Sequence, residues 1–153
     1  MNAGDHRSKT LSDKLRDVLE HKNLKEYIQD ENYLVRYAVC ETGFGLDILL
    51  HDPEPAVRRQ VAMQQYGLET LMYDRDEWVR AAVAQQGYGL NILLKDESIQ
   101  VRNIAARMIE KQEHKAGLEE TISRAEKRDA RISGSYPGNS CKRGRTAYGE
   151  TKR

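Results

Sequence analysis

The chain has 153 residues, with 25 Lys and Arg against 24 Asp and Glu, and its formal net charge at pH 7 is +1. No apolar run approaches the roughly 18 residues that a membrane-spanning helix needs, and the two cysteines, Cys40 and Cys141, are too few for a disulfide framework or a cysteine-rich metal site. We therefore expect a cytoplasmic protein without membrane contact, and the composition excludes a disulfide-stabilised secreted scaffold.

The charge is divided unevenly along the chain. Residues 1–114 hold 15 basic and 19 acidic side chains, whereas residues 115–153 hold 10 basic and 5 acidic side chains. The sequence thus joins an acidic body to a basic C-terminal part.

The chain begins with a polar segment, residues 1–11, which has no hydrophobic periodicity and which we predict to be disordered. Residues 12–30 form a degenerate N-terminal capping repeat, in which Ser12 or Asp13 is expected to cap a helix. The apolar positions of this helix fall at i, i+3 and i+4: Leu15, Val18 and Leu19. Many charged residues suit an end unit, because one of its faces meets water instead of another repeat.

Residues 30–118 consist of four copies of one pattern, and equivalent residues in consecutive copies are 22 positions apart. A Val-Arg pair recurs at this step: Val35-Arg36, Val57-Arg58, Val79-Arg80 and Val101-Arg102. An aspartate recurs at the same step: Asp30, Asp52, Asp74 and Asp96. A fixed period of about 20 to 50 residues is typical of solenoids, whose units bury their apolar faces against their neighbours.

Each copy starts with a predicted helix whose core positions lie at i, i+3, i+4 and i+7, which is one helical stripe. These positions read Val35, Ala38, Val39 and Thr42; Val57, Gln60, Val61 and Gln64; Val79, Ala82, Val83 and Gln86; Val101, Ile104, Ala105 and Met108. A column of small residues, Cys40, Ala62, Ala84 and Ala106, allows stacked helices to approach closely. We therefore interpret Cys40 as a small core residue and not as a nucleophile.

Glycine-containing turns follow the first helix of three copies. Gly43 and Gly45, Gly67, and Gly87 and Gly89 supply the positive φ values that a sharp helix exit needs. The apolar run after each turn fits a short second helix within six or seven residues. The aspartate at its end is expected to accept the free N–H groups of the next helix.

The fourth copy lacks the glycine turn, because Ile109, Glu110 and Lys111 stand in its place. We therefore predict that its helix continues from near Ser98 and that residues 119–130 extend it as a C-terminal cap. Residues 131–153 are rich in Gly, Ser, Pro, Lys and Arg, which predicts a disordered basic tail.

The pattern Asp-x-x-x-x-Val-Arg-x-x-Val-Ala, followed by Gly-x-Gly-Leu-x-x-Leu, is clearest between Asp74 and Asp96. It resembles the leucine-rich repeat variant and, more loosely, short HEAT-like repeats. The resemblance implies an all-α fold, namely a right-handed α-solenoid with capping helices at both ends, and a binding role of some kind. The period of 22 is shorter than in either family, and the chain lacks the cysteine cluster that holds an iron–sulfur centre in one known member, so we expect no cofactor and no metal.

The charged residues that recur once per copy form a predicted structural ladder: Arg36, Arg58, Arg80 and Arg102 with Asp52, Asp74 and Asp96. Because every copy repeats the same packing, we interpret the ladder as charge-assisted hydrogen bonds between copies. The alternative is a line of guanidinium groups that binds phosphate or carboxylate groups of a partner.

Specificity is expected where the copies differ. Three variable positions per copy lie on one helical flank, about 120° from the core stripe. They provide a predicted partner-binding patch: Leu34, Tyr37, Arg59, Met63, Trp78 and Arg107. Trp, Tyr and Arg dominate the energetics of protein interfaces, which favours a protein partner. The alternative is that Trp78 only covers a neighbouring helix or turn.

The sequence gives little support for catalysis. The histidines, His6, His21, His51 and His114, are dispersed and form no catalytic or metal-binding spacing. We therefore expect a non-enzymatic binding module without a small-molecule substrate, which acts on another macromolecule, foremost a protein, as an adaptor or an inhibitor.

Two alternatives remain at this stage. The first is a nucleic-acid-binding HEAT-like protein that uses the arginine ladder and an electrostatic arm of Lys142, Arg143, Arg145, Lys152 and Arg153. The acidic body weighs against it. The second is a bacterial mobile-element inhibitor of a host defence or nuclease complex, for which no particular residue argues.

Overall fold

The computed structural model describes residues 9–134, and every regular element in this range is a helix. The chain divides into two compact units, Met1–Glu113 and His114–Arg153. In chain order the helices are α1 (Leu11–Leu19), α2 (Leu24–Tyr27), α3 (Tyr33–Glu41), α4 (Leu46–Leu49), α5 (Pro55–Met63), α6 (Leu68–Leu71), α7 (Glu77–Gln85), α8 (Leu90–Leu93) and α9 (Ile99–Gly134). The predicted all-α class is confirmed for the described residues.

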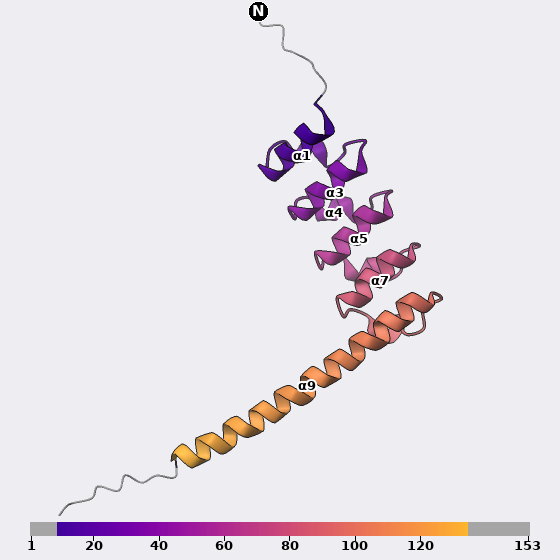
Figure 1. The fold of residues 1–153 in the computed structure, drawn as a ribbon. Helices are drawn as coiled ribbons and strands as arrows, with labels where there is room; N and C mark the ends of the chain where they lie inside the picture. The colour runs from indigo at the N-terminus through magenta and orange to yellow at the C-terminus, as the bar shows by residue number, and fades with distance from the viewer. Residues whose placement is uncertain (1–8, 135–153) are drawn as a thin grey trace, which may run out of the picture. The chain divides into compact units, whose positions relative to one another are not determined.

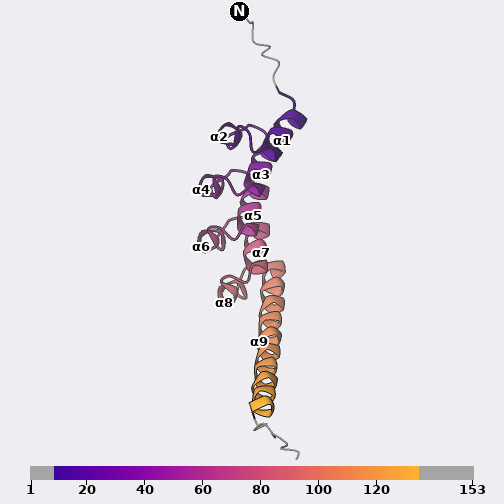
Figure 2. The same cartoon turned by 90° about the vertical axis from the view of Figure 1, so that its left-hand side faces the viewer.

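The helices of the first unit alternate between two lengths. The long helices α1, α3, α5 and α7 have nine residues each, and the short helices α2, α4, α6 and α8 have four. The long helices lie in one row and the short helices in a second row beside it (Figures 1 and 2). Consecutive long helices from α1 to α7 pack against one another, and α2, α4 and α6 each contact the long helix before and after them.

The helix bounds follow the period of the sequence. Helices α3, α5, α7 and α9 begin at Tyr33, Pro55, Glu77 and Ile99, so their starts keep the same spacing as the recurring aspartates. The short helices α4, α6 and α8 keep this step as well. They are α-helical and, at four residues, shorter than the six or seven residues that the sequence left for them.

The core follows part of the predicted stripe. Val35, Val39 and their counterparts in the next three copies are all 0% exposed, as predicted. The prediction is wrong for the Thr42 position, because Thr42 and Gln86 are only half-buried and Gln64 is exposed. The predicted column of small residues is part of the core in three copies, because Cys40, Ala62 and Ala84 are 0% exposed. Small side chains at these positions let consecutive long helices approach closely, so the position next to Val39 becomes core.

Gly67 illustrates how the turns are built. Its φ is 60°, and the equivalent residues Gly45 and Gly89 have φ values of 64° and 61°, so the predicted positive φ values are observed. A Cβ on Gly67 would lie 2.5 Å from Cδ1 of Leu50, the residue that ends the preceding short helix. Glycine is therefore favoured here by the left-handed backbone, and an added Cβ would in addition have to displace the end of the Leu50 side chain.

The starts of the long helices differ from the prediction in one detail. The N-cap residues are Asn32, Glu54 and Asp76, two positions after the recurring aspartates. The aspartate binds the N–H of the N-cap residue itself, with 2.9 Å between Asp74 Oδ1 and Asp76 N. The aspartate thus shapes the turn before the helix, and the side chains of Asn32 and Asp76 cap α3 and α7, whereas the Glu54 side chain makes no capping hydrogen bond.

Helix α1 begins at Leu11, at the end of the segment predicted to be disordered, and its N-cap is Thr10 instead of Ser12 or Asp13. Thr10 Oγ1 accepts the N–H of Asp13 at 3.3 Å, while Asp13 Oδ2 accepts the N–H of Thr10 at 3.1 Å. In this reciprocal capping box Asp13 lies three positions after the N-cap residue and binds the N–H of that residue.

Helix α9 continues through the region where the fourth copy lacks its glycine turn. Val101 and Ala105, in its first turns, are buried in the core of the first unit, and Ile104, Met108 and Ile109 pack partly against that core. The helix ends at Gly134, so residues 131–134 are helical and not part of a disordered tail. The remainder of the predicted tail and residues 1–8 lie outside the described residues.

The described part of the second unit, residues 114–134, is the later portion of α9, and none of its side chains is buried. Leu118, Ile122 and Ile132 are 55%, 49% and 61% exposed. Surface ion pairs at i, i+4 support the helix, Lys115 with Glu119 at 3.7 Å and Arg124 with Glu120 at 2.7 Å.

The turn geometry predicts opposite effects for two neighbouring substitutions. Gly67→Ala should lower the free energy of unfolding by at least about 1 kcal/mol, because it adds a collision with Leu50 to the strain of a positive φ. Gln65→Gly should leave stability unchanged or raise it by up to about 1 kcal/mol, because Gln65 already adopts a φ of 58°. Urea unfolding followed by circular dichroism measures both, and equal destabilisation by the two changes would contradict this account.

Candidate interaction face

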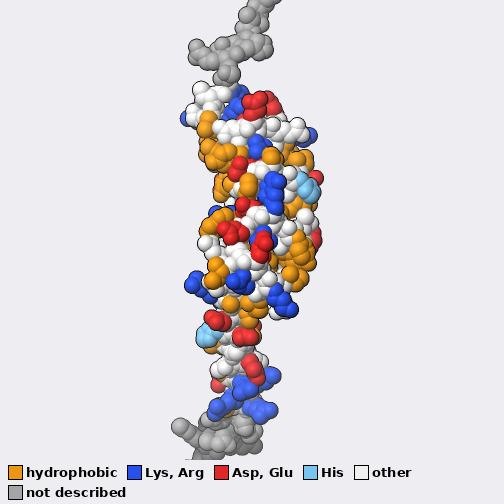
Figure 3. Space-filling view, turned by 90° about the vertical axis from the view of Figure 1, so that its right-hand side faces the viewer, with side chains coloured by type: hydrophobic (Ala, Val, Ile, Leu, Met, Phe, Trp, Pro, Cys, Tyr) orange, Lys and Arg blue, Asp and Glu red, His pale blue; other side chains and the backbone are white. Residues whose placement is uncertain are grey.

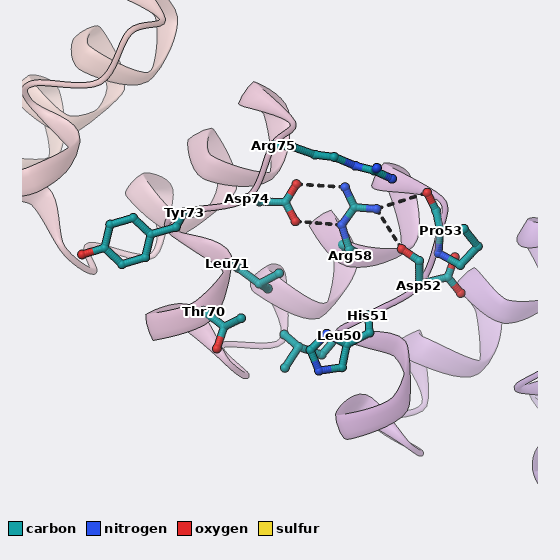
Figure 4. Close-up of a pocket in the computed structure, with 10 residues that line it drawn as sticks. All are labelled: Leu50, His51, Asp52, Pro53, Arg58, Thr70, Leu71, Tyr73, Asp74 and Arg75. Atoms are coloured by element: carbon teal, nitrogen blue, oxygen red, sulfur yellow. Dashed lines mark hydrogen bonds and ion pairs between the residues drawn. The ribbon is translucent and has the colours of Figure 1, made fainter.

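The predicted ladder is a series of bidentate ion pairs, and Figure 4 shows one of them. The guanidinium of Arg58 donates from Nε to Asp74 Oδ2 at 2.7 Å and from Nη2 to Asp74 Oδ1 at 2.8 Å. Its Nη1 donates to the carbonyl oxygens of Asp52 at 2.8 Å and Pro53 at 3.2 Å. The arginine side chain is 6% exposed and the aspartate side chain 9%. Arg58 thus links the turn before its own helix to the aspartate of the next copy.

The same geometry occurs one copy earlier and one copy later. The distances from Arg36 to Asp52 are 2.7 Å and 2.9 Å, and those from Arg80 to Asp96 are 2.7 Å and 3.0 Å. The fourth arginine of the predicted ladder, Arg102, has no aspartate partner among residues 9–134. The structure therefore brings together three of the predicted arginines with the three predicted aspartates.

A further pair precedes the ladder, and our sequence reasoning missed it. Lys14 Nζ lies 2.5 Å from Asp30 Oδ2, and the two residues are separated by the same 16 positions as Arg36 and Asp52. One period back from Arg36 leads to Lys14, so the repeat contained the signal. Lysine replaces arginine in the end copy.

Two aspartates of the ladder, Asp74 and Asp96, are held in the charged form. Burial raises the pKa of Asp74, but the hydrogen bonds from Arg58 and from the N–H of Asp76 outweigh it, so the pKa lies below the ordinary 3.8. The pKa of Asp96 is lowered in the same way by Arg80 and the N–H of Ser98, and that of Asp30 by Lys14 and the N–H of Asn32. The pKa values of Arg36, Arg58 and Arg80 are raised by their aspartate partners.

Shallow hollows lie beside the ladder in three successive copies. The one in Figure 4 has a volume of about 360 Å³ and is lined by the Arg58–Asp74 pair, by His51 and Tyr73, and by Leu71 of α6. Every lining residue has a counterpart 22 positions away in each of the other two hollows. The arginine and aspartate side chains of the ladder in these hollows bind one another, so they offer few free groups to a ligand.

The predicted partner-binding patch lies on the outward side of the long helices. Leu34 and Trp78 are 42% and 50% exposed, Met63 is 43% exposed, and Arg59 and Arg107 are also exposed. Tyr37 is half-buried, and its hydroxyl donates to Gln60 Oε1 of the next long helix at 3.0 Å. The side chains come from α3, α5, α7 and the first turns of α9.

Two residues of α1 extend this patch, and our sequence reasoning missed them. Leu15 and Leu19 lie 22 positions before Tyr37 and Glu41, and Leu19 is 80% exposed. With Val18, Ala38 and Thr42 they line an apolar hollow of about 410 Å³ between α1 and α3. We call the following set the long-helix face: Leu15, Leu19, Leu34, Tyr37, Arg59, Met63, Trp78 and Arg107.

Charged and apolar groups are separated on the surface. Figure 3 shows hydrophobic side chains along both margins of the first unit, with Lys, Arg, Asp and Glu side chains between them. The ladder contributes little to this charged surface, because the side chains of its three ion pairs are only 3–12% exposed. Apolar residues that are not needed for the core are left at the margins.

The chemistry of catalysis is sparse in the described residues. His21, His51 and His114 are exposed, and residues 9–134 contain no group of three side chains suited to hold a metal ion. Cys40 is 0% exposed, and burial raises the pKa of its thiol to about 12, with smaller contributions from Glu41 and Asp52. The thiolate needed for a nucleophile is thus suppressed at neutral pH.

The predicted nucleic-acid arm, Lys142, Arg143, Arg145, Lys152 and Arg153, lies outside the described residues, as do His6 and Cys141. Within residues 9–134, no helix has both the length and the apolar composition to cross a membrane. A scan with protein-family models finds no match to this chain, and neither the curated proteins nor the solved structures match it.

The Arg58–Asp74 pair can be tested by removing one partner or both. Arg58→Met should lower the free energy of unfolding by about 3–5 kcal/mol, because it leaves a buried carboxylate unpaired. Arg58→Met combined with Asp74→Asn should cost less than Arg58→Met alone, since the double variant buries no charge and keeps an acceptor for the N–H of Asp76.

The exposed Arg124–Glu120 pair serves as the control for this cycle. Its side chains are 76% and 68% exposed, so Arg124→Ala should leave the unfolding midpoint nearly unchanged. Urea unfolding measures all variants. Strictly additive effects of the two ladder substitutions would show that the ion pair does not couple the copies.

Acid should weaken the fold through the ladder. Asp30, Asp74 and Asp96 have folded-state pKa values below 3.8, so their contribution is fully present above that pH and is lost as the pH falls through the lowered values. The urea midpoint should therefore change little between about pH 5 and 7 and fall steeply below about pH 4. Asp74→Asn should make the acid-induced fall shallower, and a midpoint that rises toward pH 3 would contradict the assignment.

Proposed function

We propose that the chain is a non-enzymatic helical-repeat module that binds another protein through the long-helix face. In this proposal the four copies form a right-handed α-solenoid of the leucine-rich repeat variant or short HEAT-like type. Support comes from the helix starts, which recur at the period of the sequence, and from the ion pairs that join consecutive copies. Such arrays bury the positions that all copies share and leave the variable positions on the surface.

One observation carries the choice of surface. Leu19, Leu34, Met63 and Trp78 are 80%, 42%, 43% and 50% exposed, and all four occupy outward positions of consecutive long helices. Single exposed apolar residues are ordinary on protein surfaces, whereas a series across neighbouring elements is typical of an interaction site. Arg59 and Arg107 are exposed on the same face. Arginine mixed with apolar side chains is typical of protein–protein interfaces, which favours a protein partner.

The ladder itself is poorly suited to bind a partner. Arg36, Arg58 and Arg80 each direct two nitrogens at an aspartate and a third at backbone carbonyl oxygens, so few donors are left for phosphate groups. Residues 1–114 are also net acidic, with 15 basic against 19 acidic side chains, which opposes association with nucleic acid. The proposed module would therefore act on a protein, either as an adaptor or as an inhibitor that covers a working surface.

Substitution of the central aromatic residue tests the proposal. The immobilised full chain should capture a protein from a lysate, both before and after nuclease treatment, and mass spectrometry identifies it. Trp78→Ala should then weaken binding of the purified partner by roughly thirtyfold or more, as expected for a hot-spot residue, while the melting temperature stays nearly constant because Trp78 is half exposed.

Tyr73→Ala is the matched control. Tyr73 is 67% exposed and follows α6 in the row of short helices, away from the long-helix face. Its removal should leave the affinity unchanged in isothermal titration calorimetry. A loss of binding with Tyr73→Ala but not with Trp78→Ala would move the interface to the short helices, and capture that nuclease abolishes would refute a direct protein partner.

A further inference from the structure

The completed ladder pairs show what an arginine at this position is prepared to bind. In each of three copies Nε and Nη2 point at the two oxygens of one carboxylate, at distances from 2.7 Å to 3.0 Å. Nη1 is occupied separately by one or two backbone carbonyl oxygens, as in Arg58 with Asp52 and Pro53. The backbone therefore orients the guanidinium, and the carboxylate occupies the two remaining nitrogens.

Arg102 has the first half of this arrangement without the second. Its Nη1 donates to the carbonyl oxygens of Asp96 at 2.6 Å and Glu97 at 3.0 Å, which are the counterparts of Asp52 and Pro53. Its Nε and Nη2 have no hydrogen-bond or ion-pair partner within residues 9–134. The side chain is half-buried, so its orientation is restricted.

The reason lies in the sequence register. Each ladder aspartate follows its arginine by 16 positions, and the residue 16 positions after Arg102 is Leu118. The nearest carboxylates along the chain are already bound, because Asp96 pairs with Arg80 and the N–H of Ser98. Glu97 Oε1 lies 3.2 Å from Arg80 Nη2. Arg80 thus has two carboxylate partners and Arg102 has none in the described residues.

We infer that Arg102 is a carboxylate-binding site. A planar carboxylate matches the two free nitrogens, because the same fork holds one in three other copies. A phosphate dianion fits less well, since the side chains of Asp96 and Glu97 belong to the same turn and would repel its second charge. The ligand is an Asp or Glu side chain of a partner, a small carboxylic acid, or a carboxylate from the undescribed part of this chain, such as Glu150. The site does not depend on the long-helix face.

The Nε–H signals of the arginines report directly on this site in NMR spectra of the full chain with ¹⁵N-labelled arginine. We titrate sodium acetate at pH 7 and replace sodium chloride to keep the ionic strength constant. The Nε–H resonance of Arg102, assigned by its loss in Arg102→Lys, should shift and saturate with a midpoint about tenfold lower than any response of Arg59 or Arg107. The resonance of Arg58 should not move, because Asp74 occupies its fork.

Further measurements distinguish a carboxylate of this chain from an external one and compare acetate with inorganic phosphate. In Glu150→Gln, a shift of the Arg102 resonance before acetate is added identifies the chain's own carboxylate as the ligand, whereas an unchanged resonance that still responds to acetate indicates an external one. Both results support the site. A response of Arg102 no different from that of Arg59 in both the unmodified chain and Glu150→Gln, or saturation by inorganic phosphate at a lower concentration than acetate, would overturn it.

Discussion

The fold depends on a bidentate ion pair that links each copy of the pattern to the next. The guanidinium of Arg58 binds the carboxylate of Asp74 and the carbonyl oxygens before its own helix, and the same carboxylate accepts the N–H of Asp76. Three helix ends are thereby set relative to one another by two side chains. Because both charges are nearly buried, the pair is stable only with all of its hydrogen bonds in place, and a shifted register would leave charges unpaired.

Apolar packing supplies the complementary constraint. Val57, Val61 and Ala62 of α5 are 0% exposed, as are their counterparts in α3 and α7, so consecutive long helices share one continuous core. Small residues in the third of these columns allow close contact, and glycines such as Gly67 make room for the short helix of the preceding copy. Each copy can bury its apolar face only against a neighbour, which explains why the positions inside vary so little.

Function is assigned to the positions that these two constraints leave free. The outward positions of the long helices carry leucine, tyrosine, methionine, tryptophan and arginine in an order that changes from copy to copy, and most of them are exposed. The proposed interface therefore uses mainly residues that are not needed for stacking, with the exception of Tyr37, whose hydroxyl donates to Gln60 of the next long helix. Arg102 differs from the other ladder arginines. Its Nη1 keeps the contacts with backbone carbonyl oxygens, but the pattern ends before the aspartate that would bind its other two nitrogens.

The period by itself determined much of the architecture. It predicted the helical class, the copies, the glycine turns with positive φ, and three of the four ladder arginines with their aspartates, because each of these depends on local spacing and residue type. It also contained Lys14 and Leu19, which a strict continuation of the same step into α1 identifies.

Only the tertiary structure decided how far the buried face extends around each long helix. The sequence predicted both Thr42 and Cys40 to be core residues, and the packing of the neighbouring helix buries Cys40 fully but leaves Thr42 half-buried. It likewise placed the N-caps two residues after the aspartates, because those carboxylates are bound by arginines of the preceding copy. The spacing of residues along the sequence determines which side chains lie together on one face of a helix. Whether that face is buried depends on the neighbouring helix that packs against it.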